Sequence, residues 1–152
     1  MLKIRDSSLS FQDRGTVEAI MGAYRAMDRR LNDLLARDGL TRPQFLALKA
    51  VAENGSTPMN KISDCMSVTP SNVTGIIDRL VSVGYLKRGE REGDRRKIMM
   101  ELTDKGISLY NKVYTTYEEF LESILNQMTQ KERREIKKHL AKLEKAITNA
   151  DL

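Results

Sequence analysis

Hydrophobic residues recur at helical intervals over most of the chain. Between residues 17 and 35 they return every three or four positions, close to heptad spacing, which predicts one long helix that needs an apolar partner along its length. Thr41 with Gln44 forms a capping-box pattern ahead of a second apolar run. A second helix therefore begins there, and Asn54 and Gly55 end it.

Two shorter helices are expected next. Residues 59–66 carry Ile62, Cys65 and Met66 on one apolar side, and Thr69 caps the helix that follows. The apolar positions of that second helix are Val73, Ile76, Ile77 and Leu80. Their spacing of i, i+3, i+4 and i+7 buries one face. Two short helices joined by a tight turn predict a helix-turn-helix.

Residues 84–106 have the form of a basic hairpin. Two runs, 85–88 and 97–102, flank a loop rich in Gly, Arg and Asp that turns the chain and projects into solvent. Between Lys87 and Lys97 six basic residues stand against three acidic ones, a local net charge of +3. A narrow Arg-bearing finger suits nucleic-acid phosphates and the minor groove. The alternative is an ordinary solvated hairpin.

Two more helices are expected after the hairpin. Thr103 caps a long one whose apolar stripe continues to Leu125, and a second capping box, Thr129 with Glu132, opens the last. The apolar faces of the terminal helices are longer than the rest of one small domain can bury. We therefore expect them to pack against a second copy of the chain. The predicted fold class is mainly α with a small β-hairpin (α+β).

Composition narrows the class of protein. At 152 residues, with 40% hydrophobic and 31% charged residues, the chain suits one charged globular domain. The net charge of +5 is moderate, so its clustering matters more than its total. No apolar run approaches the roughly 18 residues that span a bilayer, and the first segment lacks the apolar stretch of a signal peptide. We therefore expect a cytoplasmic protein without a membrane partner.

Catalytic and metal-binding signals are weak. One cysteine, Cys65, excludes an intrachain disulfide, and a single histidine, His139, argues against a zinc site. We find no Ser-His-Asp set and no glycine-rich phosphate loop. The sequence predicts neither an enzyme nor a bound cofactor.

The order of these elements resembles the winged-helix transcription regulators of the multiple-antibiotic-resistance regulator (MarR) family over nearly the whole chain. The motifs that carry the resemblance are Leu40-Thr41 with Gln44, Val68-Thr69-Pro70-Ser71-Asn72-Val73-Thr74, Asp78-Arg79-Leu80, Gly84-Tyr85-Leu86 with Arg88, and Asp94-Arg95-Arg96 followed by Leu102-Thr103 and Gly106. The last of these is similar to the family's wing signature. Their joint order makes the signal specific.

The resemblance implies a single domain, residues 1–152, in which 41–103 form a winged helix-turn-helix lobe and 11–38 and 104–150 form dimerisation helices. It implies a homodimer on a pseudo-palindromic double-stranded operator, acting as a ligand-responsive repressor. One recognition helix would enter each major groove, and each hairpin, the wing, would reach the adjacent minor groove.

The resemblance also implies which residues contact DNA. On the recognition helix they are Thr69, Ser71, Asn72, Thr74 and Arg79, which suit base edges and phosphates. On the wing, Arg96 would read the minor groove with Asp94 orienting it, while Arg91 and Arg95 would contact phosphates. The alternatives are a helix turn satisfied by its own polar side chains, and a structural ion pair for Arg79. Asp78 is interpreted as structural.

The resemblance also implies a pocket for an effector ligand. Relatives bind small aromatic or phenolic ligands beside the dimerisation helices, which here would involve Tyr24, Arg25, Tyr110 and Tyr114. Packing of these tyrosines at an interface is the alternative.

One rival function is that of a redox-sensing regulator acting through Cys65, although the position of Cys65 on the apolar side of its helix favours a small buried hydrophobic residue. The other rival is a helical interaction module that does not bind DNA.

Overall fold

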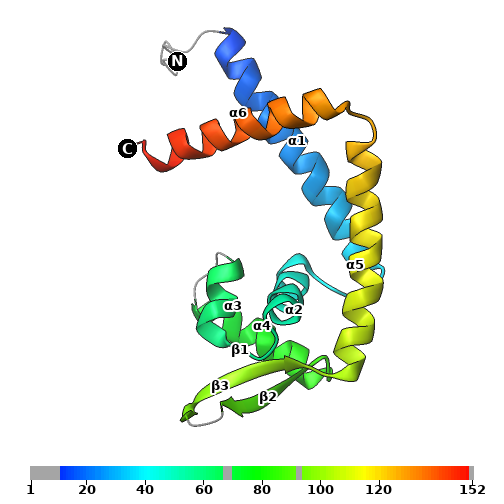
Figure 1. Ribbon diagram of the computed structural model, residues 1–152, viewed down its shortest axis with the longest axis vertical. Helices are drawn as coiled ribbons and strands as arrows, with labels where there is room; N and C mark the ends of the chain where they lie inside the picture. The colour runs from blue at the N-terminus through cyan, green and yellow to red at the C-terminus, as the bar shows by residue number, and fades with distance from the viewer. Residues whose placement is uncertain (1–10, 67–69, 92–93, 151–152) are drawn as a thin grey trace, which may run out of the picture. The chain divides into compact units, whose positions relative to one another are not determined.

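The computed structural model describes residues 11–66, 70–91 and 94–150, with the backbone alone at 11–12, 70–71, 90–91 and 94–97. The chain divides into two compact units, Met1–Val113 and Tyr114–Leu152. The first unit contains all three described strands and most of the helices (Figure 1). The predicted class, mainly helical with a small sheet, is confirmed.

Helix α1 (Phe11–Ala36) and helix α2 (Arg42–Asn54) open the first unit. At the end of α1 the amide of Leu40 donates to the Leu35 carbonyl while Gly39 takes a positive φ of 68°, a left-handed helix stop that favours glycine. The predicted capping box of α2 is present. The amide of Gln44 donates to the Thr41 hydroxyl, and the Thr41 amide donates to the Gln44 side chain.

Helices α3 (Met59–Met66) and α4 (Pro70–Ser82) are the predicted pair of short helices. Ile62 of α3 and Val73, Ile77 and Leu80 of α4 are fully buried in the core that also covers one face of α2. Residues 67–69, and with them the predicted cap Thr69, lie outside the described residues.

The prediction that Cys65 is buried is wrong. Its side chain is exposed, and Ser63 instead joins Ile62 and Met66 on the buried side of α3. An eight-residue helix buries only a narrow arc, and Ser63 and Cys65 lie on opposite flanks of Ile62 at 100° per residue. The small polar residue therefore faces the core, and the thiol faces out.

The hairpin is part of a three-stranded antiparallel sheet of order β1-β3-β2. Its strands are β1 (Thr57–Pro58), β2 (Leu86–Arg91) and β3 (Asp94–Leu102). The short β1, which pairs Thr57 with Met100, was not predicted. Most of the segment expected to be a loop belongs to the two long strands, so the hairpin is extended almost to its tip.

Helix α5 (Asp104–Leu125) begins in the first unit and ends in the second, where α6 (Gln130–Thr148) follows. Thr129 and Glu132 form the predicted capping box of α6. Helix α6 buries no residue, and Ile136, Leu140 and Ile147 are exposed. Among the described residues, no helix is long and apolar enough to cross a membrane.

Candidate nucleic-acid interface

Helix α4 has one buried face and one polar face. Val73, Ile77 and Leu80 hold it against the core, whereas Asn72, Thr74 and Arg79 are exposed. Ser71 lies in the first turn of α4, where only its backbone is described. Side chains so placed can reach a groove without disturbing the packing of the helix.

Two of the predicted residues lie on one edge of this helix. Asn72 and Arg79, two helical turns apart, both line a surface cleft of about 650 Å³ between α4 and the start of α2. Thr41 and Gln44 line its other side. Thr74 is not among the lining residues, so the polar face is broader than the cleft.

Asp78 and Arg79 are neighbours with different surroundings. The Asp78 carboxylate accepts from the Arg88 guanidinium of β2 at 2.5 Å. Among the described residues Arg79 forms no ion pair or side-chain hydrogen bond. A guanidinium without an internal partner is available to a phosphate or a guanine.

At the base of the wing, basic side chains pair with acidic ones. Lys87 lies 3.2 Å from Glu101 on the adjacent strand, and Arg88 pairs with Asp78. Lys87 first, and then the Ser56 hydroxyl, lower the pKa of Glu101 below its ordinary value. These pairs place the positive charges of Lys87 and Arg88 beside carboxylates.

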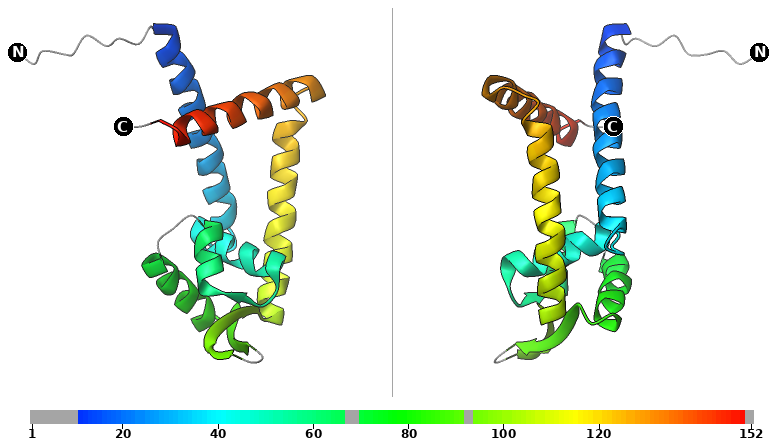
Figure 2. Two further views of the ribbon diagram at one scale, coloured as in Figure 1. Left: turned by 60° about the vertical axis from the view of Figure 1, so that its left-hand side comes forward. Right: turned by 90° about the vertical axis from the view of Figure 1, so that its right-hand side faces the viewer.

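The remaining predicted wing residues surround that tip. Arg91 is opposite Asp94 across the hairpin, and the register shifts between Glu90 and Arg91. Arg95 and Arg96 follow on β3. In both views of Figure 2 the hairpin lies at the end of the first unit that is farthest from the start of α1.

The sequence predicts Thr103 as the cap of α5, but not the contacts that join α5 to α4 and the wing. Gly84 takes a φ of 76°, and the amide of Tyr85 donates to the Leu80 carbonyl, which ends α4 in a Schellman motif. The Thr103 hydroxyl donates to the Gly84 carbonyl at 2.6 Å and accepts from the Gly106 amide at 3.0 Å. One hydroxyl thus caps α5 and fastens the α4–β2 turn.

Lys105 adds two contacts to this joint. Its ammonium donates to the Val83 carbonyl at 2.9 Å and lies 4.8 Å from the centre of the Tyr85 ring. Both suit the C-terminal end of α4, where unpaired carbonyls favour a cation. The motif Leu102-Thr103 with Gly106 therefore has a local structural role.

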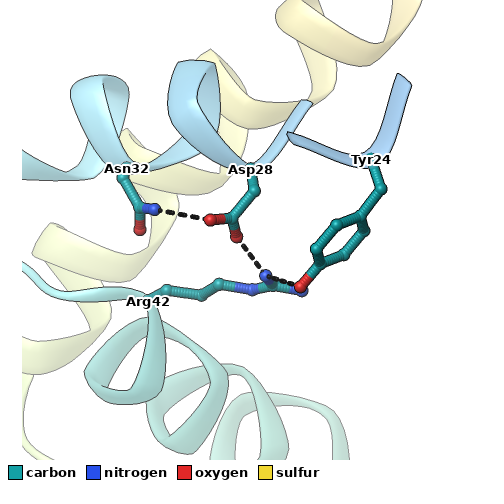
Figure 3. Close-up of polar contacts among 4 residues, drawn as sticks. All are labelled: Tyr24, Asp28, Asn32 and Arg42. Carbon is teal, nitrogen blue, oxygen red and sulfur yellow. Dashed lines mark hydrogen bonds and ion pairs between the residues drawn. The ribbon is translucent and has the colours of Figure 1, made fainter. Parts of the chain in front are cut away.

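A polar cluster joins α1 to the first residue of α2 (Figure 3). Asp28 accepts from the Arg42 guanidinium and, at 3.1 Å, from the Asn32 amide, while the Tyr24 hydroxyl accepts from Arg42 at 3.4 Å. The Tyr24 hydroxyl, and secondarily Asp28, raise the pKa of Arg42, while desolvation opposes them. Tyr24, Asp28 and Asn32 share one face of α1 at intervals of four residues.

The predicted ligand residues have different environments. Tyr24 belongs to the cluster with Arg42, and both Tyr24 and the adjacent Arg25 are exposed. Tyr110 stacks on Phe45, with ring centres 6.3 Å apart, and lines a separate cleft of about 410 Å³ beside Glu101. Tyr114 belongs to the second unit, next to the ring of Tyr117. A shared pocket of these residues stays a prediction.

Comparison with known proteins agrees with this geometry. The model of the MarR family matches residues 40–98, from the turn before α2 to the middle of β3. The regulator PecS of Dickeya dadantii is 29% identical over 81% of this chain and 76% of its own length. The repressor MdtR of Bacillus subtilis is 26% identical over 84% and 83% of the two chains.

Solved structures share the fold. A MarR-like transcription regulator from Bacillus cereus is 25% identical with a TM-score of 0.76, covering 90% of this chain and 99% of that one. AbsC, a MarR family regulator from Streptomyces coelicolor, has a TM-score of 0.84 at 18% identity, covering 95% and 99%. The second likeness concerns the fold alone.

Proposed function

The chain belongs to the MarR family of DNA-binding transcription regulators, and on that premise we propose that it is a homodimeric, ligand-responsive repressor of a pseudo-palindromic operator. As the family and its relatives are regulators, the protein is not an enzyme. The observation that carries the proposal is the exposed polar face of α4 beside an Arg-rich hairpin, with Arg79 of that face unpaired among the residues that the structure describes.

In the proposed complex α4 lies in the major groove. Asn72 can pair bidentately with adenine, and Ser71, Thr74 and Arg79 can contact phosphates or base edges. Thr69 would contribute at the start of this helix. Arg96 of the wing enters the minor groove, oriented by Asp94, and Arg91 and Arg95 contact the backbone.

The homodimer is supported by apolar side chains that the single chain leaves exposed. On α1 they include Val17, Met21 and Met27, with exposed fractions of 57%, 47% and 46%. On α6 they are Ile136, Leu140 and Ile147. Stripes of this kind are usually covered in the assembled protein. A twofold dimer would place the two α4 helices about one DNA turn apart, roughly 34–36 Å.

The proposed ligand response involves residues of α1 and α5. A small aromatic or phenolic compound would contact Tyr24, Arg25, Tyr110 and Tyr114, whose rings, hydroxyls and charge suit such a compound. By changing the separation of the two lobes it would weaken binding to an operator of fixed spacing. The cleft that Tyr110 lines beside Glu101 offers room for such a compound.

The proposal is tested by selecting bound fragments from a random-sequence duplex library and then weighing the complex. We expect enrichment of one inverted repeat and two chains per duplex. Binding should weaken steeply with added salt because phosphate contacts release counterions. Recovery of no DNA at low salt would refute DNA binding, and one chain per duplex would refute the dimer.

Exposure of Cys65 keeps one second candidate open, a redox-sensing regulator. An accessible thiol on the first helix of the helix-turn-helix could change DNA binding when it is oxidised. Replacing Cys65 by Ser should abolish the response of operator binding to peroxide if this candidate is correct. An unchanged response in the C65S variant would eliminate it.

A further inference from the structure

Within the described part of the chain, an exposed ion pair joins the recognition helix to the wing. Asp78 of α4 holds Arg88 of β2 at 2.5 Å, and their side chains are 53% and 51% exposed. We propose that Asp78 is a positioning residue for DNA binding, which fixes the wing relative to α4 by holding Arg88. The proposal rests on the proposed function and names a residue outside the predicted DNA contacts.

The strand register explains why Arg88 faces α4. Arg88 is opposite Met100 on β3 and two residues from Leu86, and both of these side chains are buried. Directly opposed residues, and residues two apart on one strand, share a face of the sheet. Arg88 therefore lies on the face of the hairpin that packs on the core, but at the edge of that core, where its side chain is exposed.

The ion pair between Asp78 and Arg88 attaches the wing to α4 at a second point, separate from the α4–β2 turn. The α4–β2 turn at Gly84 is already fastened to α5 through Thr103 and Lys105. β1 holds the hairpin on the β3 side through Met99 and Met100, whereas β2 is an edge strand of the sheet. The contact between Asp78 and Arg88 restrains β2 directly against α4, at a point beyond the turn.

The sign of the expected effect separates positioning from simple electrostatics. Asp78 lies on the polar face of α4, four residues after Thr74 and seven after Ser71. An acidic group near phosphates weakens DNA binding, so its removal should strengthen binding if charge alone matters. Loss of positioning predicts the opposite result, because the major-groove helix and the minor-groove wing must bind together.

The first test replaces Asp78 by Ala and measures operator binding by fluorescence anisotropy at constant salt. We expect a loss of about two- to fivefold, the range of one exposed pair. Asp64→Ala is the matched control, since Asp64 is exposed on α3 without an ion pair to another described residue. It removes the same charge, and binding should be unchanged or tighter. Tighter binding by D78A would overturn the proposal.

Charge reversal provides a second variant. Asp78→Arg alone adds positive charge, yet it should weaken binding because two cations now face each other. Adding Arg88→Asp restores an ion pair at the original net charge, so the double variant should recover most of the affinity lost in D78R. Binding by D78R that is stronger than wild type would contradict positioning.

A measurement without DNA separates this proposal from the proposed function. Amide hydrogen exchange of the free protein should be faster across 86–91 in D78A than in D64A, because the wing has lost a restraint. If wild type binds no duplex but this difference is seen, the proposed function fails and the restraint stands. Equal exchange in the two variants overturns the proposal whether or not DNA binds.

Discussion

Gly106 lies so close to Tyr85 that a Cβ atom at position 106 would stand 2.0 Å from the Tyr85 carbonyl oxygen. The same oxygen accepts from the Thr103 amide at 3.1 Å. The first turn of α5 and the start of the wing are therefore in backbone contact, and glycine is the residue that permits it.

Gly106→Ala should destabilise the first unit by about 2–3 kcal/mol, because the clash is with backbone that cannot swing aside. Urea unfolding followed by circular dichroism measures the loss. Gly22→Ala on α1 is the control: nothing lies within 4 Å of its Cβ, so it should raise stability by about 0.5–1 kcal/mol through helix propensity. Equal stability of G106A and wild type would contradict the contact.

The polar cluster of Figure 3 predicts a measurable coupling between α1 and α2. Asp28 and Arg42 are about one third exposed, so their pairing should contribute only about 0.5 kcal/mol after solvent screening. A double-mutant cycle with Asp28→Ala and Arg42→Ala isolates this energy. A coupling of zero would mean that the pair does not form in solution.

The second unit should show a pH dependence at Glu132. The Thr129 hydroxyl and amide lower the pKa of this carboxyl below its ordinary 4.5. A carboxyl whose pKa is lower in the folded state stabilises the fold at pH values above its unfolded pKa. This contribution to the free energy of unfolding disappears as the pH falls from about 4.5 through the folded value. Carbon NMR should find a higher pKa for Glu132 in Thr129→Ala, and an identical pKa in both proteins would disprove the capping contact.

Arg79→Ala should weaken binding of wild-type operator and reduce the salt dependence by about one phosphate contact. The reason is that its guanidinium has no partner among the described residues and lies at the edge of the cleft with Asn72. Binding titrations at four salt concentrations give the slope. An unaltered affinity and slope would place Arg79 outside the interface.

Local patterns predicted most of the fold. The capping boxes at Thr41 and Thr129 were predictable because each depends on residues only three positions apart. The strand at Thr57 was not, because two residues ending in Pro58 carry no periodic signal and form a strand only by pairing with Met100. Capping is local, whereas strand pairing depends on distant partners.

The contacts of the site were harder to predict than its residue types. The polar residues of α4 follow from helical spacing, but the ion pairs of Asp28 with Arg42 and of Asp78 with Arg88 join different elements. Cys65 was misplaced because Ser63, and not the thiol, faces the core of a helix that buries a narrow arc. The DNA contacts themselves stay predictions.

Removing the wing arginine that is predicted to enter the minor groove tests the central claim most directly. Arg96→Ala and a matched control on α6, Arg134→Ala, are compared with wild type for binding to the selected operator. The account predicts at least a tenfold loss for R96A, about 1.4 kcal/mol, with an unchanged dimer mass and near-normal binding by R134A. Equal affinities of R96A and wild type would contradict DNA reading by the wing.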